Sequence, residues 1–131
     1  MKKIIFIVCL IILTIFIKIP SYVELNNLVI VEGIGLRCEN NKYILYLKEV
    51  IPIRDDNGIS YQYKYYQGED YNINNAYKSI LEDNSKKKFF FDDTKYVVTN
   101  CKNSSKLIEY FDVNPKYIKH TNNDINKTLQ K

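Results

Sequence analysis

The sequence predicts an α+β domain with helices on one face of a mainly antiparallel sheet, preceded by an N-terminal membrane anchor or signal segment. Three patterns predict this fold class. Residues 4–17 are apolar except at one position, residues 28–66 are rich in β-branched and aromatic side chains, and residues 73–81 change to a helical period. The element order is β-β-β-α-β-α, and a length of 131 residues suits one such domain.

The first element is a short apolar segment between lysines. Two lysines precede residues 4–17 and Lys18 follows them, which is the charge pattern of an export signal. As a helix this segment spans about 21 Å, which is short for a hydrocarbon core of about 30 Å. No clear cleavage site precedes Tyr22. Residues 1–20 are therefore predicted to remain as a membrane anchor, with cleavage as the alternative, and the following domain lies outside the cytoplasm.

Two strands are predicted after the leader. Residues 28–38 are apolar at odd and even positions alike, which is typical of a strand covered on two faces. Asn40 and Asn41 mark the turn. Residues 43–53 form the second strand, which ends at Pro52 or lies at an edge there, because proline donates no hydrogen bond to a neighbouring strand.

The third strand is indicated by strict alternation. Residues 54–58 end in Asn-Gly, the strongest turn signal in the chain. Within residues 59–66, an isoleucine and three tyrosines recur at every second position. This pattern predicts a half-buried antiparallel strand. The side chains expected on its buried face are Ile59, Tyr61, Tyr63 and Tyr65.

A helix and a return to the sheet complete the domain. Residues 73–81 carry an amphipathic apolar stripe, with Asp70 or Asn72 as the N-cap. Residues 89–100 contain extended segments around an Asp-Asp kink, and Ser105 is expected to cap a short second helix. The α+β domain then covers residues 21–119, and residues 120–131 form a polar C-terminal tail.

The charge balance argues against nucleic acid as a partner. The chain carries 19 Lys and Arg against 15 Asp and Glu, a net charge of +4. Three of the lysines flank the apolar leader, so the exported part is nearly neutral. Such a domain has little positive charge with which to neutralise phosphates.

The inventory of reactive residues is too small for catalysis. His120 is the only histidine and follows the last expected element, so a catalytic triad or zinc site lacks partners. The Asp-Asp-Asn-Gly turn at residues 55–58 lacks the glutamate that closes a calcium loop. We expect no enzyme activity, no cofactor and no metal.

Two cysteines and three tyrosines are candidates for a structural or binding role. Cys38 and Cys101 both lie in the exported part, where a disulfide is permitted, and free buried thiols are the alternative. Tyr65, Tyr66 and Tyr71 near the exit of the third strand are candidates for a protein interface, with ordinary packing in the sheet as the alternative.

A series of segments follows the order found in one known family. It comprises YVELNNLVIVEGIG at Tyr22–Gly35, YQGE at Tyr66–Glu69, KKFFFDDTKYVVTN at Lys87–Asn100 and LIEYFDVNP at Leu107–Pro115. Together these segments resemble the N-terminal domain of the C subunits of bacterial spore germinant receptors, the Ger(x)C type, over about residues 22–118.

This resemblance implies a non-enzymatic role in spore germination. It implies an exported subunit, held at the cell membrane or the spore inner membrane, that works beside integral-membrane receptor subunits. Residues 4–17 then provide the contact with the membrane. The family has no catalytic residues to transfer, and the sequence names no small-molecule ligand.

The chain departs from the family in three respects. Asp93 or Thr94 stands where the family has a histidine in its strand segment. Pro20, Ser21 and Tyr22 stand where the family has its lipobox cysteine. Family members continue for two further domains, whereas this chain stops after the first. A relict fragment of a longer germination protein is therefore one alternative. An exported small-ligand-binding module, with a pocket between helix and sheet, is the alternative function.

Overall fold

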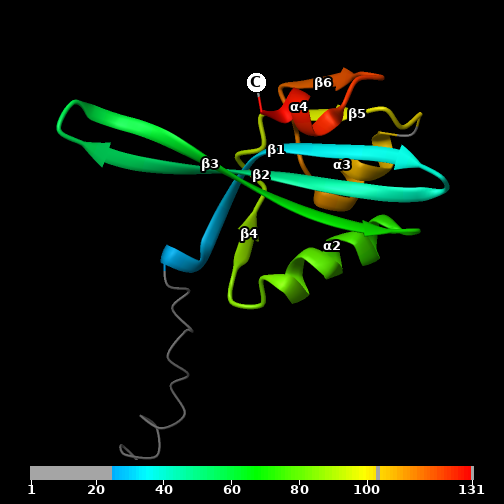
Figure 1. Ribbon diagram of the computed structural model, residues 1–131, viewed down its shortest axis with the longest axis horizontal. Helices are drawn as coiled ribbons and strands as arrows, with labels where there is room; N and C mark the ends of the chain where they lie inside the picture. Colours follow the sequence, from blue (N-terminus) through cyan, green and yellow to red (C-terminus); the bar gives the residue numbers. More distant parts are fainter. Residues whose placement is uncertain (1–24, 103, 131) are drawn as a thin grey trace, which may run out of the picture.

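The computed structural model describes residues 25–102 and 104–130, which form a single sheet with helices against both of its faces (Figure 1). The anchor predicted at residues 1–20 lies outside this part of the chain. In chain order, the elements are η1 (Leu25–Asn27), β1 (Leu28–Glu39), β2 (Lys42–Asp55), β3 (Gly58–Asp70), α2 (Ile73–Asp83), β4 (Lys88–Phe90), β5 (Tyr96–Thr99), α3 (Ser105–Phe111), β6 (Tyr117–His120) and α4 (Ile125–Leu129).

The α+β class is confirmed, but the sheet is mixed rather than mainly antiparallel. The strand order is β3-β2-β1-β5-β6, and β4 also pairs with β1. The β1–β2 and β2–β3 pairs are antiparallel, whereas β4 and β5 run parallel to β1, and β6 runs parallel to β5. The parallel half arises because the chain crosses over through α2, and later through α3, before each return to the sheet.

The larger part of the core lies between the sheet and helices α2 and α3. Gly68 of β3 sets how closely α2 approaches, since an added Cβ there would lie only 2.1 Å from the Ala76 carbonyl oxygen. Asn72 caps α2 by accepting a hydrogen bond from the Asn74 N–H. The side chains at this interface include Val29, Val31, Leu45, Leu47, Ile80, Leu107 and Phe111.

Helix α4 covers the opposite face, which corrects the expectation that helices lie on one face only. Ile125 and Leu129 are fully buried against Tyr46 and Val98, among others. Gly35 of β1 leaves room for both α4 side chains, because a Cβ there would come within 2.8 Å of each. Residues 120–131, expected to form a polar tail, thus dock through two apolar residues one helical turn apart.

A β-bulge in β1 changes which residues face the α2 side. Val31 pairs with Glu49, but the next pair on β1 is Gly33 with Lys48, so Glu32 is the additional residue. Before the bulge the odd-numbered residues face α2, and after it the even-numbered ones do. The apolar character at both parities therefore has two causes, the bulge and the cover that α4 provides.

Strands β2 and β3 continue beyond their last pair with β1, which turns away to β4, and form a projecting hairpin, here called the arm (residues 50–64; Figure 1). Pairing between β1 and β2 stops at Val31 and Glu49, whereas β2 and β3 remain paired as far as Asp55 and Gly58. Pro52 is tolerated inside β2 because it lies beyond the last β1 pair. The sequence predicts the turn at residues 54–58, but it does not show that the hairpin extends beyond its pairing with a third strand.

Smaller elements also differ from expectation. Strand β6 was not predicted, and Ser105 is the first residue of α3 rather than its cap. Ser104 occupies the N-cap position without a capping side-chain hydrogen bond. In the described ranges, none of the helices has the length and apolar character needed to cross a bilayer.

We expect Leu129→Ala to lower the free energy of unfolding by about 2 to 5 kcal/mol, because it leaves a cavity under α4. Lys127→Ala on the exposed side of the same helix is the control and should cost less than about 0.5 kcal/mol. Urea unfolding measures both variants. Equal, small effects would mean that α4 does not dock on the sheet.

Candidate binding groove

A groove of about 660 Å³ lies where the arm leaves the body of the domain. Its floor is Ile30, Val50 and Pro52, and Tyr61 and Tyr63 of β3 form one wall. All five side chains lie on the sheet face that carries α4, because Val50 and Pro52 pair directly with the two tyrosines. The groove is thus a continuation of the α4-covered face, left open because α4 stops short of it.

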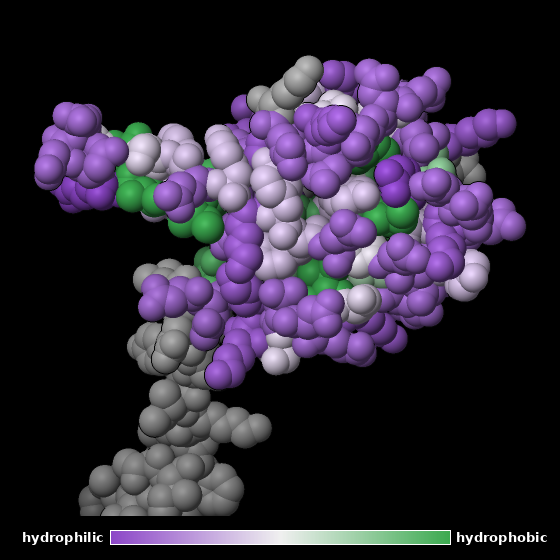
Figure 2. Space-filling model, viewed as in Figure 1, coloured by the Kyte–Doolittle hydropathy of each residue, from purple (hydrophilic) through white to green (hydrophobic). Residues whose placement is uncertain are grey.

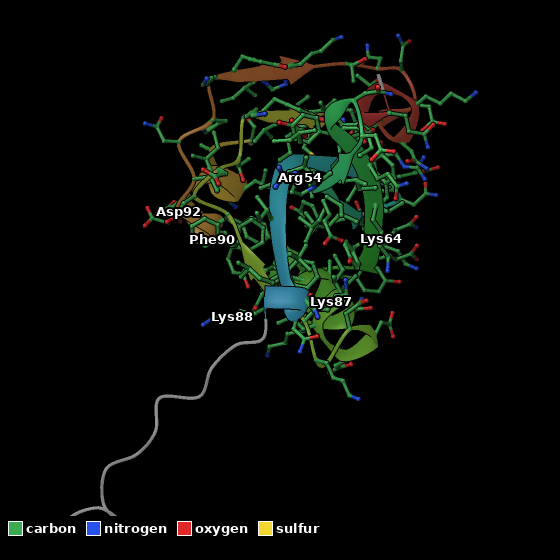
Figure 3. The ribbon with its side chains drawn as sticks, turned by 90° about the vertical axis from the view of Figure 1, so that its left-hand side faces the viewer. Arg54, Lys64, Lys87, Lys88, Phe90 and Asp92 are labelled. Carbon is green, nitrogen blue, oxygen red and sulfur yellow. A yellow bond between two sulfur atoms is a disulfide. The ribbon has the colours of Figure 1, made fainter. Side chains whose placement is uncertain are left out.

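The opposite wall is polar and comes from the connection between β4 and β5 and the connection between α3 and β6. Asp92, Asp93 and Lys95 precede β5, and Lys116 lies just before β6. Asp92 lies beside β4 in Figure 3, on the side of the arm away from Lys64. Among the described residues, neither aspartate forms an ion pair. The rim therefore presents two unpaired carboxylates across from an aromatic wall.

The tyrosine wall is much more exposed than its alternating sequence predicts. Exposure falls toward the body, from 68% at Ile59 to 58% at Tyr61 and 47% at Tyr63. The predicted common face is confirmed, since Tyr65 continues it under α4, with its hydroxyl 3.5 Å from the Leu129 carbonyl oxygen. The alternation in the sequence determines that these side chains share one face of the sheet, but it does not show how much of that face another element covers. Figure 2 shows hydrophobic patches on the arm behind a hydrophilic tip.

Buried charges fix the base of the groove. Lys48 is only 6% exposed, and its ammonium lies 3.7 Å from a Glu32 carboxylate oxygen and 4.1 Å from the centre of the Tyr63 ring. Lys95 donates a hydrogen bond of 2.9 Å to the other oxygen of Glu32. That hydrogen bond raises the pKa of Lys95, so its ammonium stays charged. The tyrosine wall is thereby held to β1 and β5.

A second polar cluster holds the opposite face of the same sheet region. The buried carboxylate of Glu49 accepts a hydrogen bond from the Tyr66 hydroxyl, which in turn accepts one of 2.8 Å from Lys87. Burial first, and then the hydrogen bond to Glu49, raise the pKa of Tyr66, so the phenol remains a donor. Residues 48 and 49 therefore hold the root of the arm from both faces.

Two of the three tyrosines proposed as an interface are not available to a partner. Tyr66 is 5% exposed and packs edge-on against Phe89. Tyr65 is half-buried under α4. Only Tyr71 is exposed, at 68%, and it lies away from the groove. Packing in the sheet is thus the correct account of Tyr65 and Tyr66. The exposed tyrosines of the arm, Tyr61 and Tyr63, replace them as the candidate surface.

Cys38 and Cys101 form a disulfide, the first of the two alternatives. Cys38 lies near the end of β1, and Cys101 follows β5, with a Cα–Cα distance of 5.3 Å. Beside it, the Asn100 side-chain oxygen accepts a 2.7 Å hydrogen bond from the Cys38 N–H. The bond therefore joins the antiparallel and parallel halves of the sheet.

The polar side of the groove carries a hydroxyl that is already hydrogen-bonded. Thr94, the hydroxyl on its polar side, donates to the Val31 carbonyl oxygen and has no histidine beside it. His120 lies exposed in β6. In the part of the chain that the structure describes, no cluster of three metal-ligating side chains occurs.

The chain matches no protein-family model, no curated protein and no solved structure.

Removing the disulfide should destabilise the domain strongly. The bond joins residues 63 positions apart, and a loop of that length corresponds to about 4 kcal/mol of lost chain entropy in the unfolded state. We expect this loss in the double variant Cys38→Ser, Cys101→Ser, measured by urea unfolding. The wild type should show the same loss on reduction, whereas the double variant should not respond to reductant. A double variant as stable as the oxidised wild type would contradict the role of the bond.

Proposed function

We propose that this protein is a membrane-tethered, extracytoplasmic interaction domain that binds a partner protein in the groove beside the arm. It is non-catalytic and resembles an accessory subunit of a spore germinant receptor. The carrying observation is the groove itself, with two exposed tyrosines on one wall and, on the other, two aspartates that form no ion pair within the described ranges.

The leader and the disulfide support the same compartment. Residues 4–17 have the pattern of an export signal or anchor. A disulfide between strands of one sheet forms and persists in an oxidising environment, outside the cytoplasm. These two features are independent, because one is a hydropathy pattern and the other a tertiary contact.

The groove has the properties of a protein interface. Tyrosine is enriched at interfaces because it offers a large contact area at a low entropic cost. The wall that Tyr61 and Tyr63 form is preorganised, since the Lys48–Glu32–Lys95 cluster fixes its base before any partner arrives. The aspartates on the facing rim favour a partner segment that carries a lysine or arginine next to apolar residues.

Tethering points to a partner in the same membrane. Only seven residues separate the apolar run from Leu25, and they can span at most about 25 Å. An anchored domain therefore stays close to the bilayer surface. An integral-membrane receptor subunit with a short extracytoplasmic segment is the partner class that this geometry favours.

A small-ligand-binding module remains the second candidate because of the size of the groove. A volume of about 660 Å³ lies within the range of small-molecule sites. A nutrient-type amino acid or sugar that binds there should raise the melting temperature in proportion to the logarithm of its concentration.

The topology is tested with reporter fusions in the native membrane. A periplasmic-type reporter fused after Lys131 should be active and a cytoplasmic-type reporter inactive, because the two lysines before the apolar run stay inside. The reverse result would contradict both the compartment and the role of the leader.

The groove is tested by photo-crosslinking. A benzophenone amino acid at position 61, in the full chain in native membranes, should give one adduct that mass spectrometry identifies as an integral-membrane protein. Position 71 is the matched control, because Tyr71 is similarly exposed but lies outside the groove. Asp92→Lys together with Asp93→Lys should reduce the adduct at position 61 by tenfold or more. Equal adducts at both positions, or none at position 61, would contradict the proposal.

A further inference from the structure

The outer edge of β3 along the arm is unpaired among the described residues. We propose that this edge pairs with the same edge of a second copy of the chain, so that two arms form an antiparallel, two-fold symmetric ribbon. This surface is the rim of β3 rather than the groove. The inference therefore goes beyond the proposed function.

The register shows which backbone groups are free. Asp55 and Gly58 flank a two-residue turn, and hydrogen-bonded pairs recur at every second residue from there. Strand β3 therefore uses its even-numbered residues to bind β2. The odd-numbered residues 59, 61, 63 and 65 direct their N–H and C=O groups to the free edge. Figure 3 shows Lys64 of this strand on the side of the arm away from Asp92.

The arm has few of the features that normally block edge pairing. Edge strands are usually protected by short length, by lysines or by proline. Residues 58–66 contain no proline and a single charge, Lys64. The other edge, β6, is protected because it has only four residues and ends in Lys119 and His120. The two edges of one sheet thus differ, and only β3 is open to strand addition.

The pairing register follows from the free backbone groups. The set 59, 61, 63 and 65 is centred on Gln62, so two-fold pairing about Gln62 places residue 59 opposite 65 and residue 61 opposite 63. Each outward N–H and C=O group of these four residues then has a partner. Lys64 faces Ser60 of the second copy, so no like charges meet. The overlap covers the arm and Tyr65 at its root, and the two bodies lie at opposite ends of the ribbon.

Membrane tethering would favour this association. Two chains held in one bilayer meet at a higher effective concentration than two chains free in solution. The pairing also places the tyrosine faces of both arms on the same side of the ribbon, since a two-fold axis normal to the sheet preserves its faces.

Disulfide crosslinking tests the register. Cys9, the one cysteine besides Cys38 and Cys101, is first replaced by serine so that it cannot form a crosslink. In this background, with the full chain in membranes, Gln62→Cys should give a crosslinked dimer under mild oxidation, because residue 62 lies opposite itself. Lys119→Cys on the β6 edge is the control and should remain monomeric. No dimer at position 62, or equal dimer at both positions, would overturn the proposal. A disulfide to a different protein at position 62 would also overturn it.

Introducing a positive or a negative charge at position 60 gives a second test that does not disturb the fold, since Ser60 is exposed. Ser60→Lys places two lysines opposite each other and should lower the crosslink yield of Gln62→Cys by about two- to fivefold per pair. Ser60→Glu places a carboxylate opposite Lys64 and should raise the yield by a similar factor. Equal yields in the two variants would overturn the register. Loss of the groove adduct at position 61 would leave this result unchanged, so the two proposals fail separately.

Discussion

The surface features of this domain depend on one constraint, the point at which β1 separates from β2 and pairs with β4 instead. Strand β1 pairs with β2 only as far as Val31 and Glu49, whereas β2 and β3 remain paired to the turn at Asp55 and Gly58. The part of the hairpin beyond β1 has no third strand to support it. It therefore projects as the arm, with one face forming the wall of a groove and one edge left open. Continued pairing of residues 28–30 with β2, in place of their pairing with β4, would have placed β1 beside Val50 and Pro52.

A projecting hairpin needs a firm root, and the buried charges provide it. Lys48 and Glu49 are adjacent in sequence, so their side chains point to opposite faces of the sheet, and each is only 6% exposed. Burial of a charge is unfavourable unless partners compensate it, and both residues have such partners. Lys48 has Glu32 and the Tyr63 ring, and Glu49 has Tyr66 and Lys87. Because these partners come from β1, β3 and the α2–β4 connection, each cluster ties the root of the arm to other parts of the body.

The groove and the disulfide lie at opposite ends of β1, and together they describe how the domain is organised. At one end, the Cys38–Cys101 bond joins β1 to the segment after β5, where the two strands share only a short parallel pairing. At the other end, the bulge at Glu32 directs a carboxylate to the groove face, where it binds Lys48 and Lys95. The rigid end keeps the sheet intact, and the polar end positions the tyrosines. A binding surface built on strands in this way needs little rearrangement when a partner arrives.

The sequence determined the local features. Periodicity located β1, β2, β3 and α2, the Asn-Gly turn set the hairpin, and alternation placed Tyr61 and Tyr63 on one face, because each depends on residues close together in the chain. The tertiary structure alone decided what covers each face. The sequence predicts a polar tail at residues 120–131 because Ile125 and Leu129 are too few apolar residues to show a helical period. Their burial against the sheet appears only in the tertiary structure. The sequence treated Tyr61 and Tyr63 as half-buried and Tyr65 and Tyr66 as an interface because alternation does not state where a covering helix ends. The parallel returns of β4, β5 and β6 were equally out of reach, since pairing between strands far apart in sequence is set by the packing of α2, α3 and the disulfide.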